Sequence, residues 1–175
     1  MKKYRLPRVF IEKELYENES HSYKHVLVFY DNKIMLTNFN SIKKGGKILV
    51  EEIYDDAYKY FLDLENSIIC NDVCIMIDDK ALLLSRGDKV FIKEFVGKDV
   101  IPLVSIGEKV ESYSRLVTIF TGKHELRYGI SGVSGIIFYF TQTEYKPQKF
   151  LFVVSKNVVM KDVIRNFERN RTHNT

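Results

Sequence analysis

Apolar residues recur along this chain mainly in short runs rich in β-branched and aromatic side chains, separated by polar turns. Residues 25–36, HVLVFYDNKIML, place two such runs on either side of Asp-Asn-Lys. Residues 73–85, VCIMIDDKALLLS, repeat the arrangement around Asp-Asp-Lys. Two apolar runs joined by a short turn of this composition favour a β-hairpin. The pattern therefore predicts two antiparallel hairpins in the N-terminal half.

One stretch of the N-terminal half has a helical period instead. Four apolar residues between Ala57 and Leu64 fall at positions i, i+3, i+4 and i+7, which is the spacing of one helix face. Asp55 or Asp56 precedes them as a candidate N-cap. We therefore predict an antiparallel β domain with one helix over residues 1–84.

The C-terminal residues show a second helical period and carry most of the net charge. Between positions 156 and 175 the chain has five basic and two acidic side chains, which supply +3 of the total net charge of +4. The apolar residues at helical spacing are Met160, Val163, Ile164 and Phe167. We predict a basic amphipathic helix within residues 155–175 that docks through its apolar face. A helix that binds nucleic acid or a membrane surface is the alternative.

Two heptapeptides in the second half echo one another. Residues 84–90 read LSRGDKV, and residues 104–110 read VSIGEKV. Each contains a glycine followed by an acidic residue, a lysine and a valine, which suits a tight turn with positive φ that leads into a strand. Two interpretations stay open: the turns are unrelated, or each belongs to one half of a pseudo-symmetric β fold.

The longest informative stretch is VSIGEKVESYSRLVTIFTGKHELRYGISGVSGIIFYF, residues 104–140. A glycine-acidic turn and a valine precede a strand, a hairpin, and a second strand that begins with a glycine and two β-branched residues. In this order the motifs resemble the biotinyl/lipoyl carrier domains and their barrel-sandwich-hybrid relatives, over residues 85–154. The whole chain is also similar to an archaeal family of unknown function whose C-terminal half has this fold.

The patterns and the resemblance together predict a mainly β chain (β-rich α+β) in three parts. Residues 1–84 form the β-rich N-terminal domain with one helix. Residues 85–154 form the biotinyl/lipoyl-like barrel-sandwich hybrid, and residues 155–175 form the basic C-terminal helix or tail.

The resemblance implies a candidate acceptor lysine at the tip of the hairpin. In carrier domains this lysine is flanked by methionine or by aspartate and alanine. The corresponding position, eleven residues before Gly135, is His124, while Lys123 lies one place earlier and follows Gly122. We therefore predict that Lys123 is an ordinary solvated turn lysine, and covalent attachment of biotin or lipoate to Lys123 is the alternative. The candidate binding residues of the exposed hairpin are Lys123, His124 and Arg127. The side chains expected to point into one core beneath the hairpin are Ile119, Ile136 and Phe138.

Other chemistry-bearing residues match no established pattern. The segment TGKH, residues 121–124, has the Gly-Lys of a phosphate-binding loop but no Ser or Thr after the lysine. Cys70 and Cys74 are four residues apart, and so are His21 and His25. A four-ligand zinc site usually needs a second pair of ligands, and neither pair can be matched with one from the sequence. We predict no catalytic site, no metal site and no cofactor. A cysteine nucleophile served by a histidine from elsewhere in the fold stays open.

Composition favours a folded cytoplasmic protein. The 175 residues are 45% hydrophobic and 13% aromatic, enough to bury one good core or two small ones. Two cysteines are too few for a disulfide scaffold, and the start, MKKYRLPRVF, lacks the apolar segment of a signal peptide. No apolar run approaches the roughly 18 residues of a membrane span. We therefore expect a cytoplasmic protein with no membrane span.

Three functional hypotheses follow. The first is a non-enzymatic binding or assembly module on an unmodified biotinyl/lipoyl-like scaffold, with an unidentified protein partner or a second copy of the chain as its ligand. The second is a biotin or lipoate carrier modified at Lys123. The third is a protein that binds nucleic acid through the basic residues of 156–175, although the nearly neutral remainder of the chain argues against a nucleic-acid surface on the fold itself.

Overall fold

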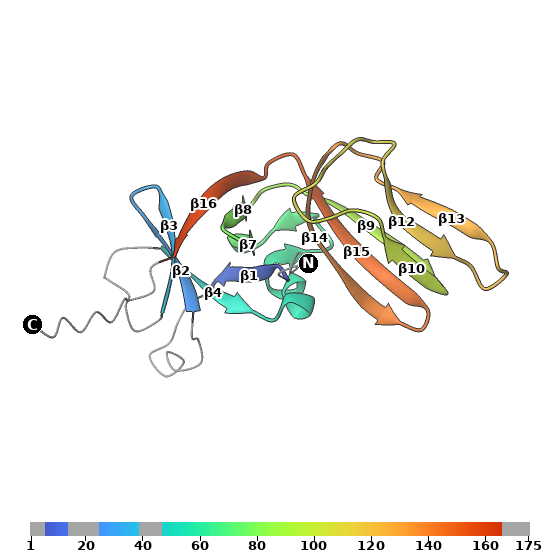
Figure 1. Ribbon diagram of the computed structural model, residues 1–175, viewed down its shortest axis with the longest axis horizontal. Coiled ribbons are helices and arrows are strands. Elements are labelled where there is room, and N and C mark those ends of the chain that lie inside the picture. The colour runs from blue at the N-terminus through green and yellow to red at the C-terminus, as the bar shows by residue number, and fades with distance from the viewer. Residues whose placement is uncertain (1–5, 14–24, 39–46, 166–175) are drawn as a thin grey trace, which may run out of the picture.

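In the computed structural model, which describes residues 6–13, 25–38 and 47–165, the chain is mainly β with one short α-helix, as predicted. Figure 1 shows a barrel at one end and a pair of packed sheets at the other, with the helical segment between them. We call the pair of sheets the sandwich.

Seven strands form a closed barrel in the order β1-β4-β2-β3-β16-β8-β7. Both predicted hairpins are present, β2–β3 and β7–β8. Asp31 and Asn32 have φ of 53° and 61°, which a two-residue turn between twisted strands requires. The strands are β1 (Arg8–Glu12), β2 (His25–Tyr30), β3 (Lys33–Asn38), β4 (Lys47–Glu52), β7 (Val73–Ile77), β8 (Lys80–Leu84) and β16 (Val159–Arg165).

The helix predicted within residues 155–175 is wrong over its described part, because residues 159–165 form β16. This strand pairs antiparallel with β8 and parallel with β3, and so closes a barrel that is otherwise antiparallel. Val163 is the one buried residue of β16, and Met160 and Ile164, which would share its face in a helix, are exposed. The physical reason is that two strand edges lie open to this segment, and pairing satisfies the backbone groups of all three strands. Residues 166–175, including Phe167, lie outside the described residues.

The sandwich consists of a three-stranded and a four-stranded sheet. The three-stranded sheet has the order β10 (Asp99–Pro102), β12 (Arg115–Phe120), β13 (Leu126–Ile130). The four-stranded sheet has the order β11 (Lys109–Val110), β14 (Gly135–Tyr145), β15 (Gln148–Ser155), β9 (Phe91–Gly97). No helix interrupts residues 99–154, as predicted. The buried residues between the sheets are Val100, Val110, Leu116, Val117, Ile137, Phe152 and Val154.

The expectation that Ile119, Ile136 and Phe138 share this core is correct only for Ile119, which packs against it. Ile136 is half-buried, and Ile137 takes the core position. Phe138 is buried on the other side of the sheet, as alternation from Ile137 requires, and the register shift of β14 against β15 between Ile137 and Tyr139 places Tyr139 on that side as well. A β-bulge of this kind reverses the faces that follow it, and sequence alternation alone does not reveal it.

The four-stranded sheet also packs against the outside of the barrel, so that its central strands β14 and β15 have buried residues on both faces. Leu151 and Val153 of β15 join Val9, Ile75 and Leu84 of the barrel in one hydrophobic cluster. The predicted helix is present here but shorter. It consists of a 3-10 turn, η3 (Tyr54–Asp56), and α1 (Tyr58–Phe61), followed at once by the short strands β5 (Leu62–Asp63) and β6 (Ile68–Ile69).

The two echoing heptapeptides fold into the same turn. Gly87 has a φ of 91°, and its N–H donates to the carbonyl of Ile69 at 2.8 Å. The carboxylate of Asp88 accepts a hydrogen bond from the N–H of Ser85 at 2.7 Å. The second turn repeats these contacts. Gly107 has a φ of 87°, and its N–H donates to the carbonyl of Ile137 at 2.7 Å. The carboxylate of Glu108 accepts a hydrogen bond from the N–H of Ser105 at 2.8 Å. The repetition supports the pseudo-symmetric interpretation of the sequence.

Candidate binding surface

The three candidate residues of the hairpin lie together at the end of β12–β13, and all three are exposed. The N–H of Thr121 donates to the carbonyl of Glu125 at 3.0 Å, and the N–H of His124 donates to the carbonyl of Thr121 at 3.1 Å. His124 has a φ of 62°. Arg127 pairs with the carboxylate of Glu125 at 2.9 Å, so its charge is offset within the hairpin. Lys123 lies in the turn itself.

An exposed apolar face lies on the three-stranded sheet, beside this hairpin end. Residues that are directly paired across a sheet share a face, and here the rows are Asp99–Phe120–Leu126, Ile101–Thr118–Tyr128 and Arg115–Ile130. We call this surface the outer face. Its large apolar side chains are 38% to 51% exposed, and they are Ile101, Phe120, Leu126, Tyr128 and Ile130.

The opposite face of the same sheet is tightly packed at Gly129. A Cβ on Gly129 would lie 2.5 Å from ring atoms of Phe95 and from a methyl group of Val117. Only glycine fits where β13 presses against β9, so the sheet cannot turn its outer face inward. The contact at Gly129 therefore fixes the outer face as the side of the sheet that is turned to solvent.

Two further features border the outer face. The guanidinium of Arg115 lies 3.9 Å from the ring centroid of Tyr128, a cation–π contact that leaves part of the ring exposed. A groove of about 500 Å³ begins at Ile101 and Phe120. Its other lining residues are Asp99, Val100, Gln142, Gln148 and Phe150.

Sequence reasoning found the hairpin but missed the outer face. The available signal is the segment LRYGI, in which Leu126, Tyr128 and Ile130 alternate with other residues. Such alternation predicts a strand with one apolar face, and it equally fits a face that is buried. Only the packing of Gly129 shows which face is covered.

The edge of the three-stranded sheet is formed by β13, at the end of the molecule opposite the barrel (Figure 1). Because Thr121 and Glu125 form a hydrogen-bonded pair, the residues of β13 that bond to β12 are those at odd positions. The N–H and C=O groups of Leu126, Tyr128 and Ile130 therefore point away from β12. Among the strands that the structure describes, none pairs with this side of β13.

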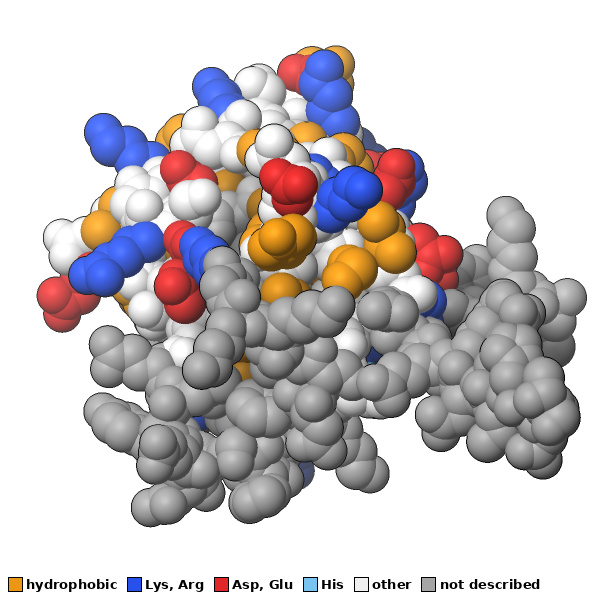
Figure 2. Space-filling model, turned by 90° about the vertical axis from the view of Figure 1, so that its left-hand side faces the viewer, with side chains coloured by type: hydrophobic (Ala, Val, Ile, Leu, Met, Phe, Trp, Pro, Cys, Tyr) orange, Lys and Arg blue, Asp and Glu red, His pale blue; other side chains and the backbone are white. Residues whose placement is uncertain are grey.

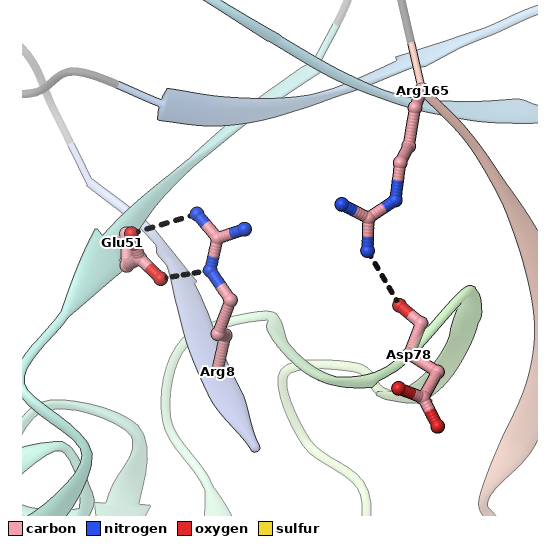
Figure 3. Close-up of polar contacts among 4 residues, drawn as sticks. All are labelled: Arg8, Glu51, Asp78 and Arg165. Carbon is pink, nitrogen blue, oxygen red and sulfur yellow. Dashed lines mark hydrogen bonds and ion pairs between the residues drawn. The ribbon is translucent and has the colours of Figure 1, made fainter. Parts of the chain in front are cut away.

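Two arginines connect segments of the barrel through separate polar contacts (Figure 3). Arg8 forms two hydrogen bonds with the carboxylate of Glu51, at 2.5 and 2.9 Å. Arg165 of β16 donates to the carboxylate of Asp79 at 2.7 Å and to the carbonyl of Asp78 at 3.3 Å. Each guanidinium has its own carboxylate, so these contacts connect strands and leave no surplus positive charge.

Figure 2 views the molecule from the barrel end, where basic and acidic side chains are interspersed over the described surface. On the coloured, described part of this face, neither sign of charge forms a continuous patch. The described part of the basic C-terminal segment, β16, is a barrel strand, and Lys80 and Asp162 form an ion pair across it at 2.6 Å. The geometry therefore offers no support for nucleic-acid binding through residues 156–165.

The cysteines are placed unfavourably for nucleophilic chemistry. Burial raises the pKa of the Cys74 thiol, and burial is also the main cause that raises the pKa of Cys70. A raised pKa keeps a thiol protonated, whereas the thiolate is the nucleophile and the metal ligand. His21 lies outside the described residues. Within the described ranges, no three His, Cys, Asp or Glu side chains are close enough together to hold a metal ion.

Among residues 6–13, 25–38 and 47–165, no helix is long and apolar enough to cross a membrane.

Comparisons with known proteins assign a family and no activity. The chain is 22% identical over 156 residues to "Uncharacterized protein MJ0859" of Methanocaldococcus jannaschii. The aligned region covers 86% of this chain and 91% of that protein. Residues 4–157 match the family described as "Uncharacterized protein conserved in archaea (DUF2118)". Because the match spans most of the 175 residues, the chain belongs to this archaeal family of uncharacterized proteins.

Proposed function

We propose that this protein is a non-enzymatic binding or assembly module, built on an unmodified biotinyl/lipoyl-like scaffold, that holds a protein partner on its outer face. The observation that carries the proposal is the gathering of Ile101, Phe120, Leu126, Tyr128 and Ile130 on one exposed sheet face. Contiguous exposed apolar patches on soluble domains commonly mark interaction surfaces.

The composition of the outer face suits a protein ligand. Interface cores are enriched in aromatic residues and arginine, and depleted in lysine and acidic residues. Phe120, Tyr128 and the stacked Arg115 provide such anchors, and Asp99 lies at the rim. An edge strand beside an apolar face also suits partners that add a strand to the sheet. The proposed location is the cytoplasm, in keeping with two cysteines that form no disulfide.

The test compares three versions of the full chain, each expressed in an archaeal host and treated with a cross-linker before purification. The outer-face variant is Leu126→Lys with Tyr128→Lys. The matched control is Ile53→Lys with Tyr145→Lys, which adds the same charge at apolar positions exposed elsewhere. We expect wild type and control to retain the same cross-linked protein, which can be a second copy, and the outer-face variant to lose it. Equal recovery from all three would refute the outer face as the binding surface.

A carrier role remains the second proposal, because Lys123 lies exposed in the hairpin turn, where a modifying ligase can reach it. Intact mass spectrometry of the protein from its native host separates the two roles. An unmodified scaffold has the mass of the chain alone, 20.6 kDa. An increment of the size of biotin or lipoate that disappears in Lys123→Ala would establish the carrier role.

A further inference from the structure

We propose that the partner on this surface is a second copy of the chain, and that β13 pairs antiparallel with β13 of that copy across a two-fold axis through Tyr128. The two three-stranded sheets then form one six-stranded sheet with a continuous outer face. This inference rests on the proposed binding role of the outer face and names its partner.

The free edge of β13 is complete enough to accept a strand. Leu126, Tyr128 and Ile130 direct their N–H and C=O groups away from β12. The register irregularity between β12 and β13 takes its extra residue from β12, between Arg115 and Val117, so the alternation along β13 is uninterrupted. Antiparallel pairing with a second β13 would form about six backbone hydrogen bonds.

The two edges of the three-stranded sheet differ in the devices that prevent strand addition. Edge strands are commonly protected by proline, lysine or inward charges. At the β10 edge, Pro102 is the last residue of the strand, Asp99 is its first, and Lys98 comes directly before it. The sequence of β13, LRYGI, contains no proline and no lysine, and its Arg127 is paired with Glu125 of the same chain. The contrast indicates that β13 is the edge built for pairing.

Three registers of antiparallel pairing between two β13 strands are compared, with the two-fold axis through Arg127, Tyr128 or Gly129. The charges and the apolar side chains favour the axis through Tyr128. A two-fold axis through Arg127 would place two arginines directly opposite one another, where like charges repel. An axis through Gly129 would leave Leu126 without an apolar residue opposite it. An axis through Tyr128 pairs Leu126 with Ile130 of the second copy, and Arg127 with Gly129 of the second copy. Only this register gives Leu126, Tyr128 and Ile130 each an apolar or aromatic residue opposite it and opposes no like charges.

Such pairing is isologous, so one surface patch serves both copies and the assembly closes as a dimer. The apolar rows of the two outer faces become neighbours at the junction, where Leu126 and Ile130 pack in cross-strand pairs. The exposed apolar side chains at this edge thereby lose part of their contact with water through these lateral contacts.

The first experiment measures mass by sedimentation velocity over a wide range of protein concentration, with wild type, Tyr128→Pro and Ile101→Lys. The N–H of Tyr128 is not needed for the β12 ladder, so proline at this position removes an intermolecular donor and spares the hairpin. We expect wild type to form a dimer, Tyr128→Pro to weaken it by at least about tenfold, and Ile101→Lys, on the far edge of the same face, to leave the dimer intact. Wild type that stays monomeric at every concentration would overturn the inference.

The second experiment tests the register by disulfide cross-linking in a Cys70→Ser background. Residues paired across the axis have Cα atoms about 5.5 Å apart, within disulfide range. We expect Tyr128→Cys to cross-link with itself. Leu126→Cys alone and Ile130→Cys alone should not, because each is about 13 Å or more from its own counterpart, whereas an equal mixture of the two should. Self-cross-linking by Leu126→Cys or Ile130→Cys, or its absence in Tyr128→Cys, would refute this register even if Tyr128→Pro did not fold.

The two proposals fail in different ways. If wild type is a monomer and yet the outer-face lysines abolish retention of another protein, self-pairing is wrong and the binding role stands. If wild type is a dimer that both Leu126→Lys with Tyr128→Lys and Ile53→Lys with Tyr145→Lys leave unchanged, the outer face has no part in association and both proposals are wrong.

Discussion

At the scale of single residues, Tyr54 and Tyr139 connect the helical segment to β14 by a reciprocal pair of hydrogen bonds. The hydroxyl of Tyr54 donates to the carbonyl of Phe140 at 2.8 Å, and that of Tyr139 donates to the carbonyl of Tyr54 at 2.6 Å. Their ring centroids are 4.8 Å apart. Burial is the main cause that raises the pKa of both phenols above the ordinary value of 10.0.

This pair predicts a loss of stability in alkali. Because both folded pKa values lie above the unfolded value, the stabilisation is fully present below pH 10 and is lost as pH rises beyond it, where the unfolded chain releases protons that the native chain retains. The free energy of unfolding should fall by up to about 1.4 kcal/mol per pH unit for each tyrosine. Tyr54→Phe should cost about 1 kcal/mol at neutral pH and flatten the alkaline slope.

Urea titrations at neutral pH and above pH 10 measure both effects. Tyr145→Phe is the matched control, since Tyr145 is 71% exposed. If Tyr145→Phe flattened the slope as much as Tyr54→Phe, the buried pair would not be its source.

A second prediction at this scale concerns Lys123. It lies exposed in a turn, so Lys123→Ala should change the free energy of unfolding by no more than about 0.5 kcal/mol. Ile137 is fully buried between the two sheets, so Ile137→Ala should cost roughly 2 to 5 kcal/mol. Urea unfolding of the two variants beside wild type measures the difference. A large cost for Lys123→Ala would mean that the lysine has a structural role that its exposure hides.

At the scale of elements, β16 is the strand on which the barrel depends for closure. It pairs with β3 on one side and β8 on the other, although the three strands are far apart in sequence. Arg165 adds a contact with Asp79 in the β7–β8 turn. Residues 159–165 are thus part of the barrel and not an appended tail.

The observed strand β16 and the helix expected from the sequence predict different burial for the adjacent residues Val163 and Ile164. A docked helix would bury Val163 and Ile164 together. In the strand, Val163 is 6% exposed and Ile164 is 46% exposed. Val163→Asp should therefore destabilise the protein by several kcal/mol, because it buries a charge without a partner, whereas Ile164→Asp should change stability by about 0.5 kcal/mol or less. Comparable losses in thermal unfolding of both variants would favour the helix.

At the scale of the whole molecule, the barrel and the sandwich share a hydrophobic cluster. Phe61 packs edge-on against Phe138 and Tyr139, with centroids 6.1 and 5.3 Å apart. Leu151 and Val153 lie in the same cluster as barrel residues. The two parts therefore cover each other's apolar surface.

The shared cluster predicts that the sandwich is unstable without the barrel. The boundary near residue 84 remains a prediction, and a fragment of residues 85–154 is its direct test. Without the barrel, the fragment exposes Phe138, Tyr139, Leu151 and Val153. We expect the full chain to unfold in one transition, and the fragment to be far less stable or to aggregate, as followed by circular dichroism and light scattering. A fragment that melts as a monomer at the temperature of the full chain would show that the sandwich is independent.

The sequence by itself determined the elements whose signals are local. The hairpins at residues 25–36 and 73–85 follow from turn residues that accept positive φ between apolar runs, and the two glycine turns follow from their shared heptapeptide. The long β region after Ser85 follows from its lack of helical period. The position of Lys123 in a hairpin turn was implied by the resemblance to carrier domains.

Only the tertiary structure decided the features that depend on distant partners. Val163 and Ile164 fit helical spacing and strand alternation alike, and the open edges of β3 and β8 select the strand. The bulge at Phe138 arises from pairing with β15 and places Phe138 and Tyr139 on the same face, where strict alternation would separate them. Whether Leu126, Tyr128 and Ile130 are buried or exposed depends on Gly129 packing beneath Phe95, a contact between sheets that no local pattern encodes. A periodic pattern specifies that a strand has an apolar face, and the neighbours in space determine what covers it.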